Sequence, residues 1–324
     1  MFPPTMDTPE HIRVAEELGY RFAHVYDSPA FLADAWITLA RAAERTSRIR
    51  IGPSVITPRL RHLVANAGAI ATLNTLAPGR VEVVVGSGFT SQLMLGEGPL
   101  RWADVERYVQ GLRALLAGED VEWNGAVIGL RYGRLSGVAL PESLTIRVAA
   151  HGPKGYAVAD RSADGMVTNL DHHSANTGPG DMSKVIASYY GTVVDEDEPW
   201  DSDRVIDATG PCAAFQLHIG GEGLVGGTPE WQAYTEALER IDPRKRHLET
   251  HRGHLIEVTD LERPLMTPEL LRNATGSGTL AQVREALAGF EAMGVEGIVY
   301  GPMGPDVPRE LAAFAEAANL AVPA

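Results

Sequence analysis

The sequence contains a single cysteine, Cys212, and only three lysines among its 28 basic residues. One cysteine excludes an intrachain disulfide framework and a cysteine-based zinc cluster. No apolar run approaches the roughly 18 residues of a membrane span, and the amino terminus lacks the basic-then-apolar pattern of a secretion signal. The net charge of −14 argues against nucleic acids and anionic membranes as partners. These absences favour a cytoplasmic protein that acts on a small molecule.

Short apolar runs alternate with helical patterns from the beginning of the chain. Residues 49–55 form an apolar run that is too short for a helix, residues 61–76 carry apolar side chains at helical spacing, and residues 81–85 form a β-branched run. Strands of this kind are buried on both faces, as in a parallel sheet that helices cover. The alternation predicts an α/β fold, and 324 residues suffice for a barrel, which typically needs about 250.

The alternation of strand and helix patterns is interrupted once along the chain. Further buried strands are predicted at residues 144–149 and 165–167, and the helix and strand patterns return over residues 279–318. Between them, residues 170–268 contain an acidic stretch and glycine-rich turns, which indicates an insertion over the carboxyl-end face of the sheet. We therefore predict that residues 1–324 form one (β/α)8 TIM barrel domain with a large insertion near residues 170–268.

Several motifs occur in a characteristic order. SVITP at residues 54–58 is followed by APGR at 77–80 and GSGF at 86–89. A second block covers residues 149–167 and a third covers 278–300. In this order and spacing the motifs resemble the bacterial luciferase-like superfamily, and more closely its branch that uses the deazaflavin coenzyme F420. Within that branch the chain is similar to the methylenetetrahydromethanopterin-reductase-like group.

The resemblance also raises a question about the first strand. A complete barrel of this family begins with a strand just before FPP, but here Met1 directly precedes Phe2, Pro3 and Pro4. Prolines cannot donate to a strand ladder. We expect either a start upstream of Met1 or a short or missing first strand. Because the family pairs its barrels through early helices, a twofold homodimer is also expected.

A glycine-rich turn marks the expected phosphate site. Gly152 follows a predicted strand and precedes a helix, whose free amides and positive dipole end attract anions. Lys154 adds a positive charge. An ordinary strand-to-helix turn is the alternative, and the resemblance favours the phosphate of the cofactor. The predicted residues here are Ala150, His151, Gly152, Pro153, Lys154 and Gly155.

Two polar turns are expected to hold the rest of the cofactor. By resemblance, the peptide between Ser54 and Val55 is cis and forms a bulge that backs the isoalloxazine-type ring; the alternative is a normal strand end. Hydroxyl and amide side chains after the second turn suit a polyol, because each can donate and accept. A bare Gly-x-Gly is more often only a turn. The predicted contacts are Ser54, Val55, Thr57, Ser87, Gly88, Thr90 and Gln92, with coenzyme F420 (8-hydroxy-5-deazaflavin) as cofactor and FMN as the alternative.

This chain lacks two catalytic residues that occur in some members of the family it resembles. Its sugar-phosphate dehydrogenases carry a histidine and a glutamate at the positions of Ser28 and Phe89. This departure argues against sugar-phosphate oxidation and removes the expected acid–base pair. We therefore predict an activated acceptor that needs little help from a proton. Asp27 and His62 are the best remaining proton sources, although a structural role for Asp27 is an equal alternative.

A histidine-rich segment near the end of the insertion permits two interpretations. His247 and His251 are spaced i, i+4, and His254 follows. This spacing can place two imidazoles on one helix face, as in zinc sites. However, no glutamate follows the first histidine as in HExxH, and Gly253 interrupts the helix. We favour a hydrogen-bonded histidine cluster and predict no metal.

The predicted function is hydride transfer between reduced coenzyme F420 and a small activated organic acceptor. A two-component, FMN-dependent monooxygenase of the luciferase type is the first alternative. A flavin-binding protein without catalysis is the second, suggested by Ser28 and Phe89 in place of the acid–base pair. The sequence alone does not identify the substrate.

Overall fold

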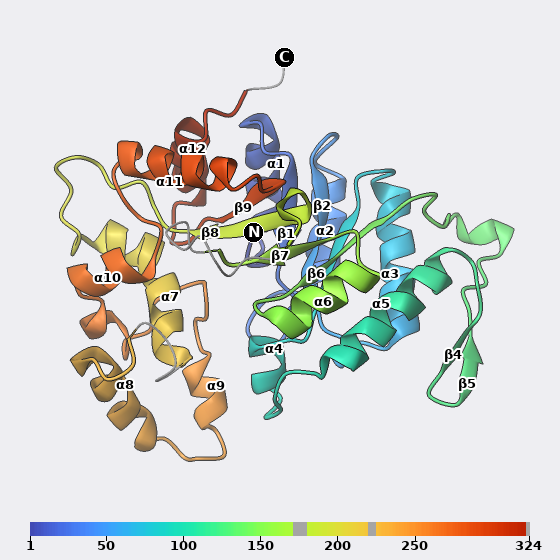
Figure 1. The fold of residues 1–324 in the computed structure, drawn as a ribbon, viewed down its shortest axis with the longest axis horizontal. Coiled ribbons are helices and arrows are strands. Elements are labelled where there is room, and N and C mark those ends of the chain that lie inside the picture. Colours follow the sequence, from blue (N-terminus) through green and yellow to red (C-terminus); the bar gives the residue numbers. More distant parts are fainter. Residues whose placement is uncertain (171–179, 220–224, 322–324) are drawn as a thin grey trace.

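The computed structural model describes residues 1–170, 180–219 and 225–321. Within them, seven parallel strands form one sheet in the order β1-β2-β3-β6-β7-β8-β9 (Figure 1). Every neighbouring pair is parallel, as expected for strands joined by crossover helices. The strands are β1 (Phe22–Val25), β2 (Arg50–Ile56), β3 (Glu82–Gly86), β6 (Thr145–Ala149), β7 (Gly165–Thr168), β8 (Val185–Tyr190) and β9 (Gly297–Gly301).

The gap between the two edge strands is narrow. Phe2 forms a parallel bridge with Val25 of β1, and the amino group of Met1 donates to the carbonyl of Tyr300 in β9. Met1 and Phe2 therefore lie where a further barrel strand would lie, and the sheet is nearly closed. The prediction of a parallel barrel with a short or missing first strand is confirmed for the described residues.

Helices cover the outside of the sheet, as the continuous apolar strands require. Most of the buried apolar side chains belong to this helix–sheet layer. Figure 1 shows these helices on both sides of the strands. They are α1 (Thr8–Glu17), α2 (Ala35–Ala43), α3 (Leu63–Leu76), α5 (Trp102–Leu116), α6 (Pro153–Ser162), α11 (Leu280–Ala292) and α12 (Val307–Ala317), while β4 (Val121–Trp123) and β5 (Ala126–Ile128) form a separate hairpin.

The remaining helices form a helical cap beside the barrel. They pack around a separate apolar cluster that includes Val205, Leu217, Tyr234 and Leu271. Among the described residues, none of the helices has the combination of length and apolarity that a membrane span needs. The cap helices are α7 (Asp203–His218), α8 (Pro229–Glu239), α9 (Arg246–Thr250) and α10 (Pro268–Ala274), and the short α4 (Thr90–Leu93) follows β3.

One barrel strand lies inside the segment 170–268 that the sequence indicated as an insertion. β8 pairs with β7 on one side and with β9 on the other. The barrel alternation therefore extends to residue 190, and the cap helices begin only at Asp203. The sequence did not lead to the prediction of this strand, because acidic and glycine-rich segments lie near it and suggested an insertion without barrel strands. Residues 171–179 and 220–224 of the segment lie outside the described residues.

A charged cluster is buried among the first strands of the barrel. The Glu82 side chain is only 1% exposed and lies 2.9 Å from Arg147 Nε, 3.2 Å from His24 Nε2 and 3.2 Å from Arg50 Nη1. Arg147 also forms a two-pronged ion pair with Glu296, at 2.6 and 2.8 Å. Burial raises the pKa of Glu82, but these partners outweigh it and lower the pKa to about 2. Glu82 is therefore a carboxylate that the folded barrel holds charged.

Candidate functional site

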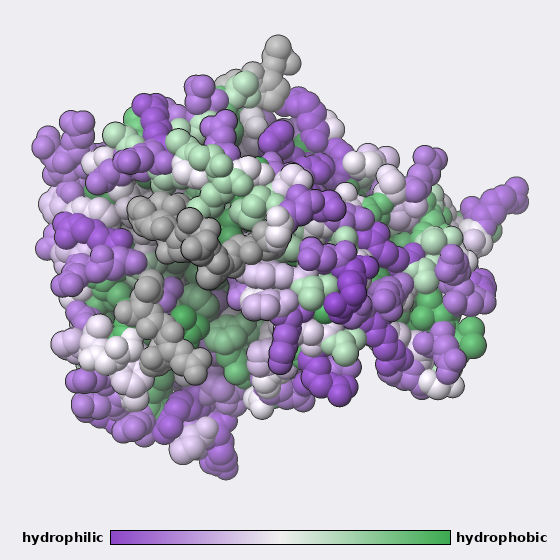
Figure 2. All heavy atoms as spheres, viewed as in Figure 1, coloured by the Kyte–Doolittle hydropathy of each residue, from purple (hydrophilic) through white to green (hydrophobic). Residues whose placement is uncertain are grey.

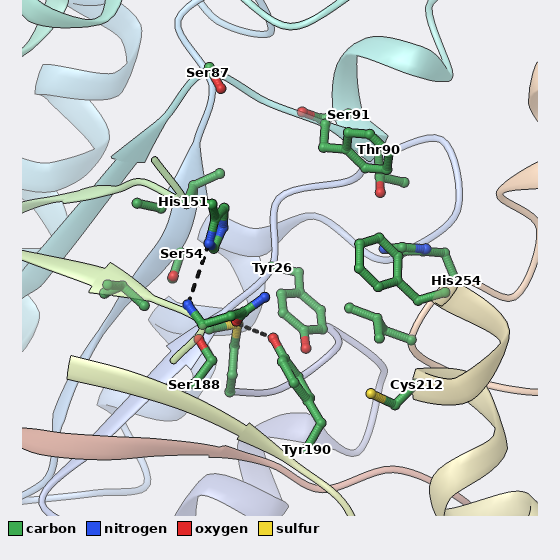
Figure 3. A pocket seen from close by; sticks show the side chains of 18 of the residues that line it. Tyr26, Ser54, Ser87, Thr90, Ser91, His151, Ser188, Tyr190, Cys212 and His254 are labelled. Carbon is green, nitrogen blue, oxygen red and sulfur yellow. Dashed lines mark hydrogen bonds between the residues drawn. The ribbon is translucent and has the colours of Figure 1, made fainter. Parts of the chain in front are cut away.

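A cavity of about 1240 Å³ opens at the carboxyl ends of the barrel strands, between the barrel and the helical cap. In Figure 2 this face is hollowed there, and hydrophobic residues show at the bottom of the hollow. Figure 3 shows Ser54 and His151 on the barrel side of the cavity, and Cys212 and His254 on the side of the cap. Ligands of parallel barrels bind at this end of the strands.

The structure brings most of the predicted site residues into this one cavity. Five of them are not in its lining: His62, Thr57, Gly88, Gln92 and Ala150. The predicted residues that line the cavity are Asp27, Ser54, Val55, Ser87, Thr90, His151, Gly152, Pro153, Lys154 and Gly155. Their roles toward a cofactor stay predictions.

The end of β2 has the predicted backbone geometry. The peptide between Ser54 and Val55 is cis, which confirms the expectation, and the pairing of β2 with β3 shifts register there. Opposite this point, a Cβ atom added to Gly86 would lie 3.0 to 3.1 Å from the Val55 side chain. The glycine thus allows Val55 to pack closely against β3 while it lines the cavity.

The turn after β3 carries several hydroxyl groups. Ser87 and Thr90 line the cavity, and so does Ser91, which was not among the residues predicted from the sequence. Thr57 supports the turn from behind, because its Oγ1 lies 2.9 Å from Ser91 Oγ. Gln92 is fully buried, and neither of its amide atoms has a hydrogen-bond partner among the described residues. The hydroxyls of Ser87, Thr90 and Ser91 therefore present donors and acceptors suited to a polyol, whereas Gln92 does not reach the cavity.

The beginning of α6 is open toward the cavity. Gly152 is the N-cap residue, and no side chain caps this end among the described residues. The amides of Lys154 and Gly155 lie in the first turn, where helical amides have no intrahelical partner. A Cβ atom at Gly152 would meet nothing within 4 Å, whereas one at Gly155 would collide with Trp102 and Ala150. The geometry leaves room for an anion directly above the free amides.

Asp27 is a buried carboxylate in the cavity wall. It is 4% exposed and is paired with Arg61, which also lies 2.7 Å from Asp34. Asp34 in turn caps α2 by accepting from two backbone amides. Burial raises the pKa of Asp27 above its ordinary value, although Arg61 opposes the shift. Its Oδ1 is buried and has no hydrogen-bond partner among the described residues, so this oxygen is an unused acceptor beside the cavity.

His62, the other predicted proton source, has a different environment. Its side chain is exposed, and Nδ1 accepts a hydrogen bond from the amide of Val64 at 3.3 Å. It is the N-cap of α3 and does not line the cavity. Capping by a side-chain acceptor explains the position of this histidine without a catalytic role.

Three polar residues of the cavity floor were not found from the sequence. Tyr190 and Ser188 belong to β8, the strand that lies within the predicted insertion at residues 170–268. Tyr26 follows β1. Burial raises the pKa of Tyr190 to about 12, so its phenol is a neutral hydrogen-bond donor at physiological pH. The apolar run VIASYY at Val185–Tyr190 was the available signal, since it matches a buried strand.

The cap side of the cavity is aromatic. Phe89 is 41% exposed and makes edge contacts with the rings of His251 and Phe215, at centroid distances of 5.7 and 5.9 Å. His254 lies in the lining, but His247 does not. The helix expected to carry His247 and His251 on one face ends earlier, because α9 stops at Thr250 and His251 is its C-cap residue.

A parallel barrel with a ligand-sized cavity at the carboxyl ends of its strands has the architecture of a barrel enzyme. The chain belongs to the luciferase-like monooxygenase family, whose profile matches residues 3–190.

Individual relatives use coenzyme F420. The chain is 39% identical over 139 residues to the F420-dependent glucose-6-phosphate dehydrogenase of Beutenbergia cavernae, covering 40% of each chain. It is 26% identical over 325 residues to the 5,10-methylenetetrahydromethanopterin reductase of Archaeoglobus fulgidus, covering 93% of this chain and 91% of the relative. The coenzyme F420-dependent tetrahydromethanopterin reductase of Methanopyrus kandleri shares the fold, with a TM-score of 0.66, 19% identity and coverage of 99% and 98%. Matches to the first curated relatives span only 40 to 52% of their length.

Proposed function

We propose that the protein is an oxidoreductase that transfers a hydride between reduced coenzyme F420 and a small activated organic acceptor. The observation that carries the proposal is the single cavity that contains both the open N-terminus of α6 and the Val55 bulge. Relatives named as F420-dependent glucose-6-phosphate dehydrogenases support the choice of cofactor. The proposal concerns the whole chain, because the barrel and the cap both line the cavity.

The residues present fit this cofactor. The amides of Lys154 and Gly155 would bind its phosphate, with Lys154 as a nearby positive charge. Val55 would pack against the face of the ring, and the hydroxyls of Ser87 and Thr90 would bind the polyol chain. When bound in its reduced form, the cofactor supplies the hydride. The protein would orient the acceptor and exclude water from the cavity.

The acceptor would need little acid catalysis. Ser28 lines the cavity and Phe89 is present where a glutamate serves in sugar-phosphate dehydrogenases of the resembled branch. Both departures argue against a sugar phosphate as substrate. An iminium, a conjugated alkene or an electron-poor ring would accept a hydride with little proton transfer. The hydroxyl of Tyr190 donates to Met1 Sδ at 3.6 Å, and it would exchange that weak contact for a hydrogen bond to the acceptor.

Asp27 would be the proton source or orienting group that remains. We expect Asp27→Asn to lower kcat by about 10- to 100-fold, at the low end of general-acid effects, because the acceptor is already activated. Its dissociation constant for the cofactor should change little. His62→Gln is the matched control, and we expect nearly unchanged turnover because His62 is exposed outside the cavity. Steady-state kinetics with a titrated cofactor would measure both; a loss above about 10⁴-fold for Asp27→Asn would show that Asp27 is an essential acid.

FMN-dependent monooxygenation is the second candidate, because the family is named for monooxygenases. Fluorescence or absorbance titration of the purified protein with FMN and F420, each oxidised and reduced, separates the candidates. We expect F420 to bind and FMN to bind far more weakly. Sub-micromolar FMN affinity without detectable F420 binding would contradict the proposal. Binding of F420 without turnover of any activated acceptor would favour a flavin-binding protein without catalysis.

We further propose a homodimer in the cytoplasm, with no nucleic acid or membrane partner. The twofold dimer rests on the family resemblance, and the cytoplasmic setting rests on the single cysteine. Cys212 is a free, buried thiol. Light scattering at micromolar concentration would test the dimer, and a monomer would contradict it.

A further inference from the structure

Three histidines from distant parts of the chain meet where the cap adjoins the cavity. His218 is the last residue of α7, whereas His251 and His254 follow α9. Their ring centroids are separated by 5.6, 5.7 and 5.6 Å, so the rings form a nearly equilateral triangle. One nitrogen from each ring can be chosen so that all three lie within 4.8 Å of one another.

The spacing of the nitrogens matches a tetrahedral metal site. Zn²⁺ binds imidazole nitrogens at about 2.0 to 2.1 Å, so two ligands at the tetrahedral angle lie about 3.4 Å apart. His218 Nδ1 and His254 Nδ1 are 3.4 Å apart. The third nitrogen, on His251, lies within 4.8 Å of the other two, so its ring would have to move closer to complete the set.

A carboxylate orients the first of these ligands. His218 Nε2 lies 2.5 Å from Glu262 Oε1, and the other oxygen of Glu262 accepts from the amide and the hydroxyl of Thr259 at 2.9 and 2.8 Å. Glu262 is only 2% exposed and therefore holds the ring of His218 firmly. With the proton on Nε2, the lone pair of His218 is on Nδ1, which faces His254. Carboxylates bind the outer nitrogen of metal-ligating histidines in this way.

The second ligand is a buried histidine. His251 is 3% exposed, and its Nδ1 has no hydrogen-bond partner among the described residues. Gly253, with φ of 72°, allows the chain to turn sharply between His251 and His254. Phe89 contacts His251 and Tyr234 stacks on His218, so aromatic rings cover two of the three histidines.

We propose that His218, His251 and His254 bind one divalent transition-metal ion, with Zn²⁺ as the preferred ion and one coordination position open. Three imidazole nitrogens suit zinc and its neighbours better than Mg²⁺ or Ca²⁺, which prefer oxygen ligands. No fourth histidine, cysteine or carboxylate joins the set among the described residues. Three protein ligands with a free fourth position are typical of reactive zinc sites, whereas structural sites have four.

The site is close enough to the cavity to act on its contents. His254 belongs both to the cluster and to the cavity lining, next to Leu255 and Phe215. An ion held by His254 would therefore lie in the cavity wall, and its open position would bind an anionic or carbonyl oxygen. The alternative arrangement is three neutral histidines joined by hydrogen bonds, which would not require a metal.

Metal analysis of the full-length protein distinguishes these arrangements. The protein is stripped with a chelator, and Zn²⁺ is titrated in competition with a chromophoric chelator. We expect one Zn²⁺ per chain in the wild type and a higher thermal midpoint with Zn²⁺ than without it. His251→Gln and His254→Gln should each lose this binding. A stoichiometry well below one per chain for the folded wild type would overturn the proposal.

Two further variants test whether Zn²⁺ binding depends specifically on the three histidines. His247→Gln removes a neighbouring histidine that is outside the cluster, and it should bind Zn²⁺ like the wild type. Glu262→Gln keeps an acceptor for His218 but removes the charge, and it should weaken Zn²⁺ binding by about 10- to 100-fold. Circular dichroism confirms that each variant is folded. Equal Zn²⁺ affinity in all variants would overturn the proposal, even if the wild type bound one ion.

Substitution of Co²⁺ for Zn²⁺ tests whether the fourth coordination position of the metal is open. Co²⁺ in place of Zn²⁺ should give the visible absorption of a four-coordinate ion. Acetate serves as the probe, because its carboxylate should displace water from the open position and change the spectrum. An unchanged spectrum at saturating acetate would contradict an open position. Because the readouts are metal content and absorption, failure here leaves the F420 proposal intact, and the cofactor titration can fail independently.

Discussion

Gly152→Val is expected to weaken F420 binding by about 10²- to 10³-fold while leaving the fold stable. The valine side chain would fill the space above the free amides of Lys154 and Gly155, and each charged hydrogen bond lost there is worth about 1.5 to 3 kcal/mol. The backbone tolerates the change, because Gly152 is extended, with φ of −178°, and nothing lies within 4 Å of the added Cβ. Titration of the cofactor and urea unfolding would measure the two effects separately.

Three companion variants make this result interpretable. Lys154→Ala should cost only about 1 to 3 kcal/mol of binding, because it removes one charge and leaves the amides. Gly133→Val is the matched control, since Gly133 is exposed and also has nothing within 4 Å of the added Cβ, and it should leave binding unchanged. Gly155→Val should instead destabilise the fold, because the side chain collides with Trp102 and Ala150. Negligible effects of both Gly152→Val and Lys154→Ala would remove the phosphate assignment.

Glu82→Gln is expected to lower the free energy of unfolding at pH 7 by about 3 to 5 kcal/mol. The variant leaves the buried guanidinium of Arg147 without the carboxylate that lies 2.9 Å away. The matched control is Glu296→Gln, whose carboxylate pairs with the same guanidinium but is 36% exposed. Because solvent screens the Arg147–Glu296 pair, we expect Glu296→Gln to lower the free energy of unfolding by about 1 kcal/mol or less. Urea unfolding of both variants would measure the difference.

The same carboxylate predicts how stability depends on pH. The pKa of Glu82 in the folded protein is about 2, below its ordinary value of 4.5. The folded state therefore binds this proton less readily than the unfolded state. The stabilisation, about 3 kcal/mol, is fully present above pH 4.5 and is lost as the pH falls from 4.5 to about 2. Glu82→Gln should flatten the acid limb of the stability curve in this window; an unchanged slope would contradict the assignment.

Local signals in the sequence were sufficient for much of the fold and for several of the turns that line the cavity. Apolar runs of four to seven residues, such as those that became β2 and β3, indicate buried strands because side-chain periodicity is a property of the strand itself. Gly152 and Pro153 begin α6 where the sequence placed a helix start, since glycine and proline restrict the backbone locally. The cis peptide at Ser54–Val55 was expected only from the family motif, because no local pattern specifies it.

The tertiary structure decided which distant side chains meet. Arg61 forms an ion pair with Asp27, which lies 34 residues earlier in the chain. Glu82 lies within an otherwise apolar run, and its ion-pair partners Arg50 and Arg147 come from the two neighbouring strands. The sequence grouped His247 with His251, but α9 ends between them and His218, more than 30 residues earlier in the chain, completes the cluster instead. Such contacts depend on how helices and strands pack, and spacing along the chain carries no information about packing between elements. The sequence thus determined the barrel and the turns that line the cavity, whereas the packing of barrel strands decided the charged pairs and the packing of the cap decided the histidine cluster.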